Sequence, residues 1–203
     1  MTYRTLEGRG EAAFEVRGSE FIGHAEPARG VESAEGFVRT VREAYPDATH
    51  NVPAYRVRVG SGPGGDGLLR EYQNDDGEPS GSAGKPIQNV LQGEELENVA
   101  VVVTRYYGGT NLGVGGLVRA YARAAKEAIE DAGIAEEEVQ ATFSVTVEYD
   151  DSGTVRGVLE SADCEFEADY GERVAFDVRV PEPEREALVE RLRSATNGRA
   201  DPE

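Results

Sequence analysis

An uninterrupted apolar strand, followed by a glycine-rich segment and a helix, most constrains what this chain can fold into. Residues 98–104, NVAVVVT, are almost entirely apolar, which is typical of a central strand buried on both faces of a sheet. Apolar residues at helical spacing follow over residues 117–132, and Gly133 can end that helix. The sequence therefore predicts a strand, a glycine loop and an amphipathic helix in direct succession.

Shorter elements are predicted earlier in the same half of the chain. They are two strands within residues 14–25 joined by a turn at Arg17-Gly18, a helix from Ser33 to about Tyr45, a strand over residues 54–59, and a short helix from Pro86 to about Gln92. Two segments rich in glycine, proline and serine, residues 60–67 and 75–86, are predicted to be loops.

A second pattern begins after residues 133–141, GIAEEEVQA, which we expect to link two domains. Strands and helices then alternate in the order β-α-β-β-α, which is typical of a ferredoxin-like module whose final strand is missing or very short. We therefore predict an α+β protein with domains at residues 1–135 and 142–203.

The chain carries a net charge of −18, yet acids are absent from one long segment. Acids exceed bases in both residues 1–141 and residues 142–203, so the charge is spread over the surface, as is typical of a protein from a high-salt cytosol. From Asn98 to Lys126 the chain has no Asp or Glu, although 39 acids in 203 residues predict several there. Burial explains this gap in the strand but not in the loop and helix that follow.

Composition also restricts the setting in which the chain works. The single cysteine, Cys164, allows no internal disulfide, and the first residues lack the apolar region of a signal peptide. No stretch approaches the roughly 20 apolar residues of a membrane span. These features predict a soluble, cytoplasmic protein with no membrane partner.

The segment RYYGGTNLGVGGLVRAYARAAK, residues 105–126, has the composition of an anion-binding loop. It lacks the lysine and Ser/Thr of the GxxxxGK[ST] nucleotide loop and the third glycine of the GxGxxG dinucleotide motif. Glycine backbone N–H groups before a helix N-terminus nevertheless favour anions in general, and Arg119 and Arg123 add positive charge. Alternatively, the glycines allow tight packing and the arginines pair with acids elsewhere.

A second polar segment, DDGEPSGSAGKP at residues 75–86, holds the residues best suited to catalysis. Asp75, Asp76 and Glu78 are candidates to bind a divalent ion or to act as acid and base, with His50 as a partner. The alternative is a solvated turn, since Asp-Gly and Pro-Ser-Gly are turn formers in their own right. No GxSxG motif is present, and two histidines with one cysteine form no metal-ligand set.

Three segments in a fixed order resemble the YigZ/IMPACT family. They are DATHN and AYRV within residues 47–57, DDGEPSGSAGKPI at residues 75–87, and VVVTRYYGGTNLGVGGLVRAY at residues 101–121. The resemblance covers about residues 10–132, and residues 142–198 look like the family's C-terminal companion domain. The motif residues that match are His50, Asp75, Asp76, Gly77, Glu78, Ser80, Gly81, Gly84, Arg105, Tyr106, Gly108, Gly109, Gly113, Gly116, Arg119 and Tyr121.

Four positions depart from the family's pattern. Asn111 stands where a basic residue is common, and Lys85 stands where arginine is frequent. Val52 replaces a frequent cysteine, and Gln88 occupies a position that is usually apolar.

The resemblance implies an N-terminal β-α superfold similar to domain IV of elongation factor G and to the GHMP kinases, and a C-terminal ferredoxin-like domain similar to domain V of that factor. Eukaryotic members of the family look like regulators of translation under amino-acid starvation. The chain is therefore expected to be a non-enzymatic translation-associated factor that binds the ribosome, RNA or a ribosome-bound protein, without a cofactor. The alternative is a small-molecule enzyme, or a phosphate-ligand-binding protein, that uses the loop at residues 75–86.

We expect the partner to bind in a groove between that loop and the segment that follows the central strand. The candidate binding residues are His50, Asp75, Asp76, Glu78, Ser80, Lys85, Arg105, Tyr106, Gly108, Gly109, Asn111 and Arg119. No catalytic residue and no metal ligand is assigned.

Overall fold

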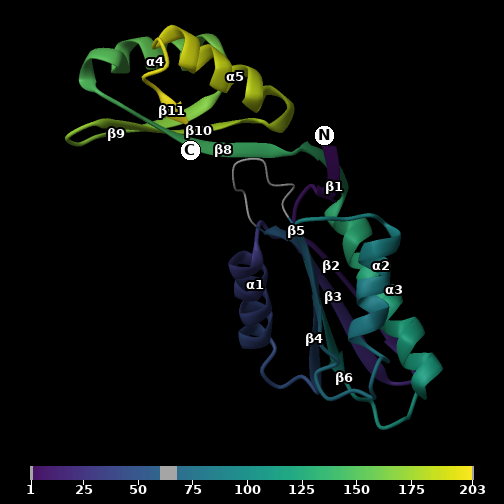
Figure 1. The fold of residues 1–203 in the computed structure, drawn as a ribbon. Coiled ribbons are helices and arrows are strands. Elements are labelled where there is room, and N and C mark those ends of the chain that lie inside the picture. Colours follow the sequence, from purple (N-terminus) through teal and green to yellow (C-terminus); the bar gives the residue numbers. More distant parts are fainter. Residues whose placement is uncertain (1, 60–67, 203) are drawn as a thin grey trace. The chain divides into compact units, whose positions relative to one another are not determined.

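A computed structural model describes residues 2–59 and 68–202 of the chain (Figure 1). Contacts within the chain divide its described residues into an N-terminal unit, residues 3–59 with 68–137, and a C-terminal unit, residues 138–202 with Thr2. The predicted loop at residues 60–67 lies outside the described residues. None of the helices in the described part of the chain combines the length and the apolarity that a bilayer span requires.

The N-terminal unit is built on an antiparallel five-stranded sheet. Its strands lie in the order β2 (Gly10–Val16), β3 (Ser19–Pro27), β6 (Val99–Tyr106), β4 (His50–Val59) and β5 (Leu68–Gln73). The central strand β6 is buried at every residue except Tyr106. The prediction of a central strand buried on both faces is confirmed.

Helices cover both faces of this sheet, which is why the first five residues of its central strand, 99–103, are all apolar (Figure 1). Helices α2 (Gly84–Gly93) and α3 (Val114–Ala132) lie on one face, and α1 (Val31–Ala44) lies on the other. Alternate residues of β6 therefore enter different cores: Val103 packs beneath α2 and α3, and Val102 packs against α1.

Local backbone signals were predicted with mixed success. The turn between β2 and β3 lies at Arg17 and Gly18, both with positive φ (50° and 81°), as a tight two-residue hairpin requires. Gly133 ends α3 as predicted. The prediction that Ser33 caps α1 is wrong, because Gly30 occupies that position with φ 87° and no side-chain bond is made.

Helix α3 begins three residues earlier than the sequence predicts. Its N-cap is Gly113, with φ 72°, and the helix starts at Val114 instead of Leu117. Gly115 and Gly116 are poor helix formers, so local propensity places the start after them. The packing of the long apolar face of α3 outweighs that local cost.

The segment expected to be a linker, residues 133–141, is mostly strand. Strand β7 (Ile134–Glu138) pairs with β1 (Thr2–Leu6), and β8 (Gln140–Val147) begins two residues after β7 ends. The domain boundaries themselves stay a prediction.

The C-terminal unit packs two helices on a four-stranded antiparallel sheet. Its elements are β8, α4 (Tyr149–Ser161), β9 (Glu165–Tyr170), β10 (Val174–Pro181), α5 (Glu182–Ala195) and the two-residue strand β11 (Asp201–Pro202). The strand order is β11-β8-β10-β9, and the core is formed by residues such as Val145, Leu159, Phe176 and Leu192. Together the two units make the chain an α+β protein.

Candidate functional site

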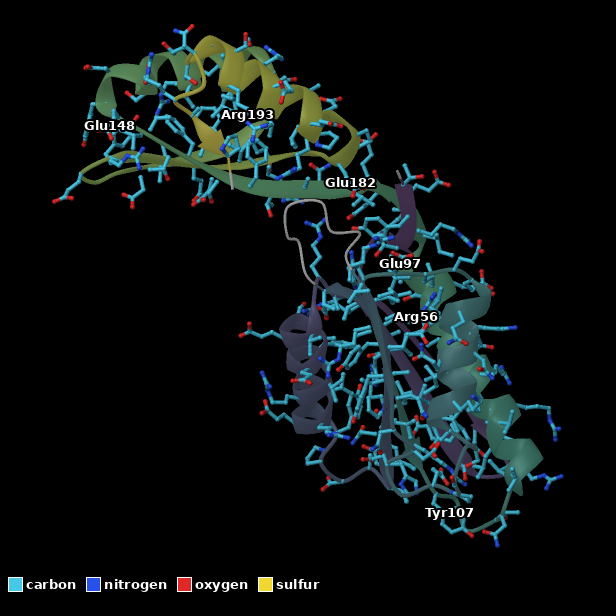
Figure 2. The ribbon with its side chains drawn as sticks, viewed as in Figure 1. Arg56, Glu97, Tyr107, Glu148, Glu182 and Arg193 are labelled. Atoms are coloured by element: carbon cyan, nitrogen blue, oxygen red, sulfur yellow. The ribbon has the colours of Figure 1, made fainter. Side chains whose placement is uncertain are left out.

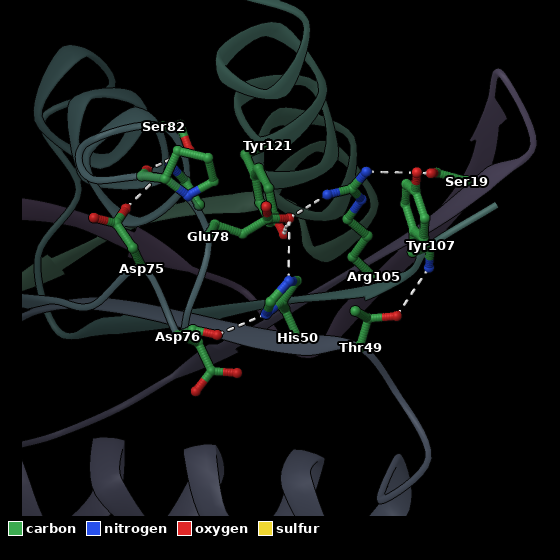
Figure 3. Close-up of polar contacts among 12 residues, drawn as sticks. Ser19, Thr49, His50, Asp75, Asp76, Glu78, Ser82, Arg105, Tyr107 and Tyr121 are labelled. Carbon is green, nitrogen blue, oxygen red and sulfur yellow. Dashed lines mark hydrogen bonds and ion pairs between the residues drawn. The ribbon is translucent and has the colours of Figure 1, made fainter. Parts of the chain in front are cut away.

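A buried ion pair joins the polar segment that begins at residue 75 to β6, the central strand of the N-terminal unit. Arg105, near the end of β6, donates from Nη1 to Oε1 of Glu78 at 2.5 Å, and the two side chains are only 5% and 4% exposed (Figure 3). Because β6 places alternate residues on opposite faces, Arg105 lies on the same face as Val103, beneath α2 and α3. The pair therefore lies inside the unit, where it connects the loop that holds Glu78 to the sheet.

Two further side chains complete this cluster around Glu78. Tyr121 of α3 donates its hydroxyl to Oε1 of Glu78 at 2.8 Å, and Nε2 of His50 lies 3.8 Å from the same oxygen. Nδ1 of His50 donates to the backbone carbonyl of Asp76 at 2.6 Å. Burial, followed by the negative charge of Glu78, raises the pKa of Tyr121, so its hydroxyl stays protonated and remains a donor. We call Glu78, Arg105, Tyr121 and His50 the buried cluster.

The two aspartates of the loop organise its backbone. Asp75 accepts the backbone N–H groups of Gly81, Ala83 and Gly84 at 2.8, 3.1 and 2.9 Å, so it caps the start of α2. Asp76, which has a positive φ of 49°, accepts the backbone N–H of Asn51 at 2.8 Å. Both carboxylates are committed to fixing a tight turn.

Asp76 and the serines of the loop have further structural partners. Arg42 of α1 donates to Oδ1 of Asp76 at 3.0 Å. Ser82 is fully buried and donates its hydroxyl to the carbonyl of Pro79 at 2.5 Å, whereas Ser80 and Lys85 are exposed. Within residues 2–59 and 68–202 no three Asp, Glu, His or Cys side chains gather in a way that could hold a metal ion.

The segment after β6 presents a different kind of surface. Tyr107 is 45% exposed, its backbone N–H donates to Oγ1 of Thr49 at 2.9 Å, and its hydroxyl donates to Oδ1 of Asn111 at 3.1 Å. Val114, at the start of α3, is 58% exposed, and Arg119 one turn later is also exposed. We call the exposed residues Tyr107, Gly109, Asn111, Val114 and Arg119 the loop surface.

The buried cluster contacts residues of the loop surface and fixes their positions. The guanidinium carbon of Arg105 lies 5.4 Å from the centre of the Tyr107 ring and 5.5 Å from that of Phe21. Oγ of Ser19 accepts hydrogen bonds from Nη2 of Arg105 at 3.3 Å and from the backbone N–H of Gly108 at 3.1 Å. A Cβ atom at Gly108 would lie 1.9 Å from the carbonyl oxygen of Gly18, so this glycine is required for packing.

A row of polar side chains crosses the opposite face of the sheet and reaches the same loop. Nδ1 of His24 lies 3.1 Å from Oε2 of Glu11, and its Nε2 lies 3.2 Å from Oγ1 of Thr104. That hydroxyl is also 2.7 Å from Oδ1 of Asn51, whose backbone N–H binds Asp76. The row links four of the five strands of the sheet.

Acidification is expected to destabilise the protein through His24. Burial lowers the pKa of this imidazole from its usual value near 6.5, against the opposing effect of Glu11. Below that value the unfolded chain binds a proton that the folded protein excludes, so the free energy of unfolding falls until the pH passes the lowered folded-state pKa. Urea denaturation of the wild type and of His24→Gln between about pH 7.5 and about pH 5 measures this effect. A stability difference between the two proteins that does not change with pH would contradict the prediction.

Comparisons with known proteins assign the chain to a family. Residues 17–129 match the model of the Impact N-terminal domain, and residues 145–199 match a domain of unknown function, DUF1949. The chain belongs to the IMPACT family. The IMPACT family member YvyE of Bacillus subtilis is 34% identical over 201 residues, which cover 98% of this chain and 89% of that protein.

Other IMPACT relatives agree with this assignment. The family member YigZ of Escherichia coli is 34% identical over 168 residues, which cover 82% of this chain and 80% of the relative. A crystal structure of a hypothetical protein has a TM-score of 0.75 and 29% identity, and the match covers 99% of this chain and 96% of that one. The resemblance recognised in the sequence is thus confirmed at the level of the family.

The structure of this IMPACT chain separates the predicted binding residues into two groups. His50, Asp75, Asp76, Glu78 and Arg105 contact one another or the backbone of the loop. The exposed or half-exposed candidates are Ser80, Lys85, Tyr106, Gly108, Gly109, Asn111 and Arg119. The predicted groove stays a prediction, but Glu78 and Arg105 touch directly and cannot be its two facing walls.

Sequence reasoning missed the residues that connect these groups. Ser19, Thr49 and Tyr107 were not proposed, although each makes a hydrogen bond to the segment after β6. Ser19 precedes Gly108 by 89 residues, so no local pattern could join them. Only the neighbouring positions of β3, β6 and β4 in the sheet bring them together.

Proposed function

We propose that this IMPACT-family chain is a non-enzymatic factor that binds the translation machinery, with ribosomal RNA as the partner of its loop surface. The observation that carries the proposal is the combination of an acid-free exposed surface with a buried cluster that fixes it. The carboxylates suited to catalysis are already bound to Arg105, Tyr121 and backbone N–H groups. The residues that remain exposed at this end of the N-terminal unit are those of the loop surface, which is suited to binding a partner.

The chemistry of the loop surface suits a phosphate backbone. The first turn of α3 contains no acidic residue, and its N-cap, Gly113, has no side chain to cap it. The first backbone N–H groups of a helix have no partner within the helix and carry a partial positive charge. Arg119 lies beside this turn, since its Nη1 would be 3.5 Å from a Cβ placed on Gly115. A cation and helical N–H groups together favour an anion, and the exposed ring of Tyr107 offers a stacking face of the kind that unpaired RNA bases use.

An anion also meets less close repulsion at this segment than elsewhere on the acidic chain. The chain has a net charge of −18, so most of its surface repels RNA, and the acid-free segment from Asn98 to Lys126 is the exception. The resemblance of the family to two domains of a ribosomal elongation factor supports the same partner. In the C-terminal unit, the element order β8-α4-β9-β10-α5-β11 is consistent with the proposed ferredoxin-like domain.

Reversal of the charge at Arg119 is expected to release the chain from ribosomes. In sucrose-gradient sedimentation of a native high-salt lysate, the wild type should travel with ribosomes, and Arg119→Glu should bind about tenfold or more weakly through the loss of a charge-assisted contact. Lys126→Glu is the matched control, because it makes the same charge change on the exposed side of the same helix, two turns away. It should sediment like the wild type.

Arg105 is unsuitable for this experiment, because its reversal would place two carboxylates in the buried cluster. At molar salt the Debye length falls to about 3 Å, so direct contacts, and not long-range attraction, must carry the binding. The affinity should therefore change little between moderate and high salt. A wild-type protein that stays at the top of the gradient, together with turnover of a phosphorylated metabolite that Asp76→Asn abolishes, would instead support the small-molecule enzyme.

A further inference from the structure

Two exposed tyrosines lie against each other on the C-terminal unit. Tyr149 opens α4 and is 53% exposed, and Tyr170 ends β9 and is 54% exposed. Their ring centres are 6.5 Å apart and the ring planes make an angle of 40°. We call these residues the tyrosine pair.

The rings of the tyrosine pair are held in place before any partner arrives. The hydroxyl of Tyr149 donates to the backbone carbonyl of Gly171 at 2.8 Å, and Nη2 of Arg156 donates to the hydroxyl of Tyr170 at 2.7 Å. Arg156 is itself positioned over the ring of Phe166, 5.5 Å from its centre. With their polar ends occupied, the tyrosines offer fixed ring surfaces to the solvent, which lowers the entropy cost of binding.

The charges next to the tyrosine pair select the partner. Exposed carboxylates next to the rings along the chain are Glu148, Asp150 and Glu172. Of the nearby cations, Arg156 lies 3.8 Å from a carboxylate oxygen of Glu160, and Arg173 pairs with Glu148 at 3.0 Å. The balance at this place is negative, so it repels phosphate and attracts a cation.

We propose that the tyrosine pair is a docking site for an arginine-bearing segment of a protein partner. A guanidinium is planar and weakly hydrated, so it stacks on aromatic rings while neighbouring carboxylates accept its N–H groups. This surface has the opposite charge preference to the loop surface, and its partner is a protein instead of RNA. The inference does not depend on the function proposed for the N-terminal unit.

High salt distinguishes this site from general attraction to an acidic protein. Exposed charges separated by more than about 3 Å are screened at molar salt, whereas ring stacking is a contact interaction. The test is fluorescence anisotropy of a labelled oligo-arginine peptide with the full chain at about 0.15 M and about 2 M KCl. Wild-type chain should still bind the peptide at the higher concentration.

Two double variants separate recognition by the rings from their structural role. Tyr149→Leu/Tyr170→Leu removes the aromatic faces, and we expect binding at high salt to weaken about five- to thirtyfold. Tyr149→Phe/Tyr170→Phe keeps the faces but loses both hydroxyl bonds that hold them in place, so its affinity should fall by less than that of the leucine variant. Arg119→Glu, in the N-terminal unit, should bind the peptide like the wild type.

Three results would overturn the proposal. These are loss of wild-type binding at high salt, unchanged binding by the leucine variant, and an equal loss in the phenylalanine variant, which would assign the effect to the hydroxyl bonds. Circular dichroism reports whether each variant is folded. If the leucine double variant is not, the single variant Tyr149→Leu, which leaves β9 and its bond from Arg156 intact, provides the same comparison against Tyr149→Phe.

Discussion

Replacement of Arg105 by methionine is expected to lower the free energy of unfolding by about 3–5 kcal/mol, because it leaves the carboxylate of Glu78 buried without its cation. The remaining partners do not compensate, since Tyr121 supplies one hydrogen bond and Nε2 of His50 is 3.8 Å away. Urea denaturation of the full chain, followed by circular dichroism, measures the loss. Figure 3 shows Arg105, Tyr121 and His50 arranged around Glu78.

Two controls identify the buried charge as the cause. Arg105→Met combined with Glu78→Gln removes both charges and keeps an acceptor for Tyr121, so it should recover most of the lost stability. Arg193→Met breaks an exposed pair with Glu190 on α5 and should cost no more than about 0.5 kcal/mol. If Arg105→Met cost as little as Arg193→Met, the buried cluster would not support the loop surface as proposed.

Gly23→Ala is expected to destabilise the protein by about 1–3 kcal/mol or more, because strand and helix backbones meet at this residue. A Cβ atom at Gly23 of β3 would lie 2.2 Å from the carbonyl oxygen of Ala124 in α3, a backbone atom that cannot move without the helix. Gly23 has no positive φ, so the effect is steric and not conformational. Thermal unfolding of the variant provides the measurement.

The same substitution in α1 should act in the opposite direction. A Cβ atom at Gly36 would approach only the end of the Arg39 side chain, at 3.8 Å, so alanine meets no obstacle there. Gly36→Ala is expected to stabilise the protein by about 0.5–1 kcal/mol, since alanine has the higher helix propensity. Equal effects of the two substitutions would show that backbone contact at Gly23 is not what limits its size.

The two surfaces proposed for this chain prefer partners of opposite charge. The loop surface lacks acids and carries Arg119, whereas carboxylates flank the tyrosine pair. Figure 2 shows side chains that end in nitrogen or oxygen over much of both units. The loop surface differs from them by its lack of carboxylates, and the tyrosine pair differs by its two exposed rings. A ribonucleoprotein offers both phosphate and arginine, and the two experiments test these contacts separately.

Elements that depend on near neighbours in the chain could be predicted. The apolar run at residues 98–104 identified β6, the turn was correctly placed at Arg17 and Gly18, and Gly133 marked the end of α3. Each of these signals is contained in a few consecutive residues. Family membership was also recognisable, since three motifs in order are a property of the sequence.

Predictions failed where packing competes with local preference. Ser33 is a good cap by residue type, but α1 begins at Val31, so its capping position falls on Gly30. The start of α3 was predicted three residues too late, because Gly115 and Gly116 have low helix propensity. Tertiary packing nevertheless stabilises the first turn that contains them.

The sequence by itself determined which residues carry charge, which runs are apolar and which family the chain belongs to. Only the tertiary structure decided that Arg105 is buried against Glu78 and Tyr121 while Arg119 remains exposed, although both stand in one acid-free segment. The physical reason is that an ion pair depends on distances between strands and loops far apart in the chain. The order of strands in the sheet sets those distances, and no local pattern encodes them.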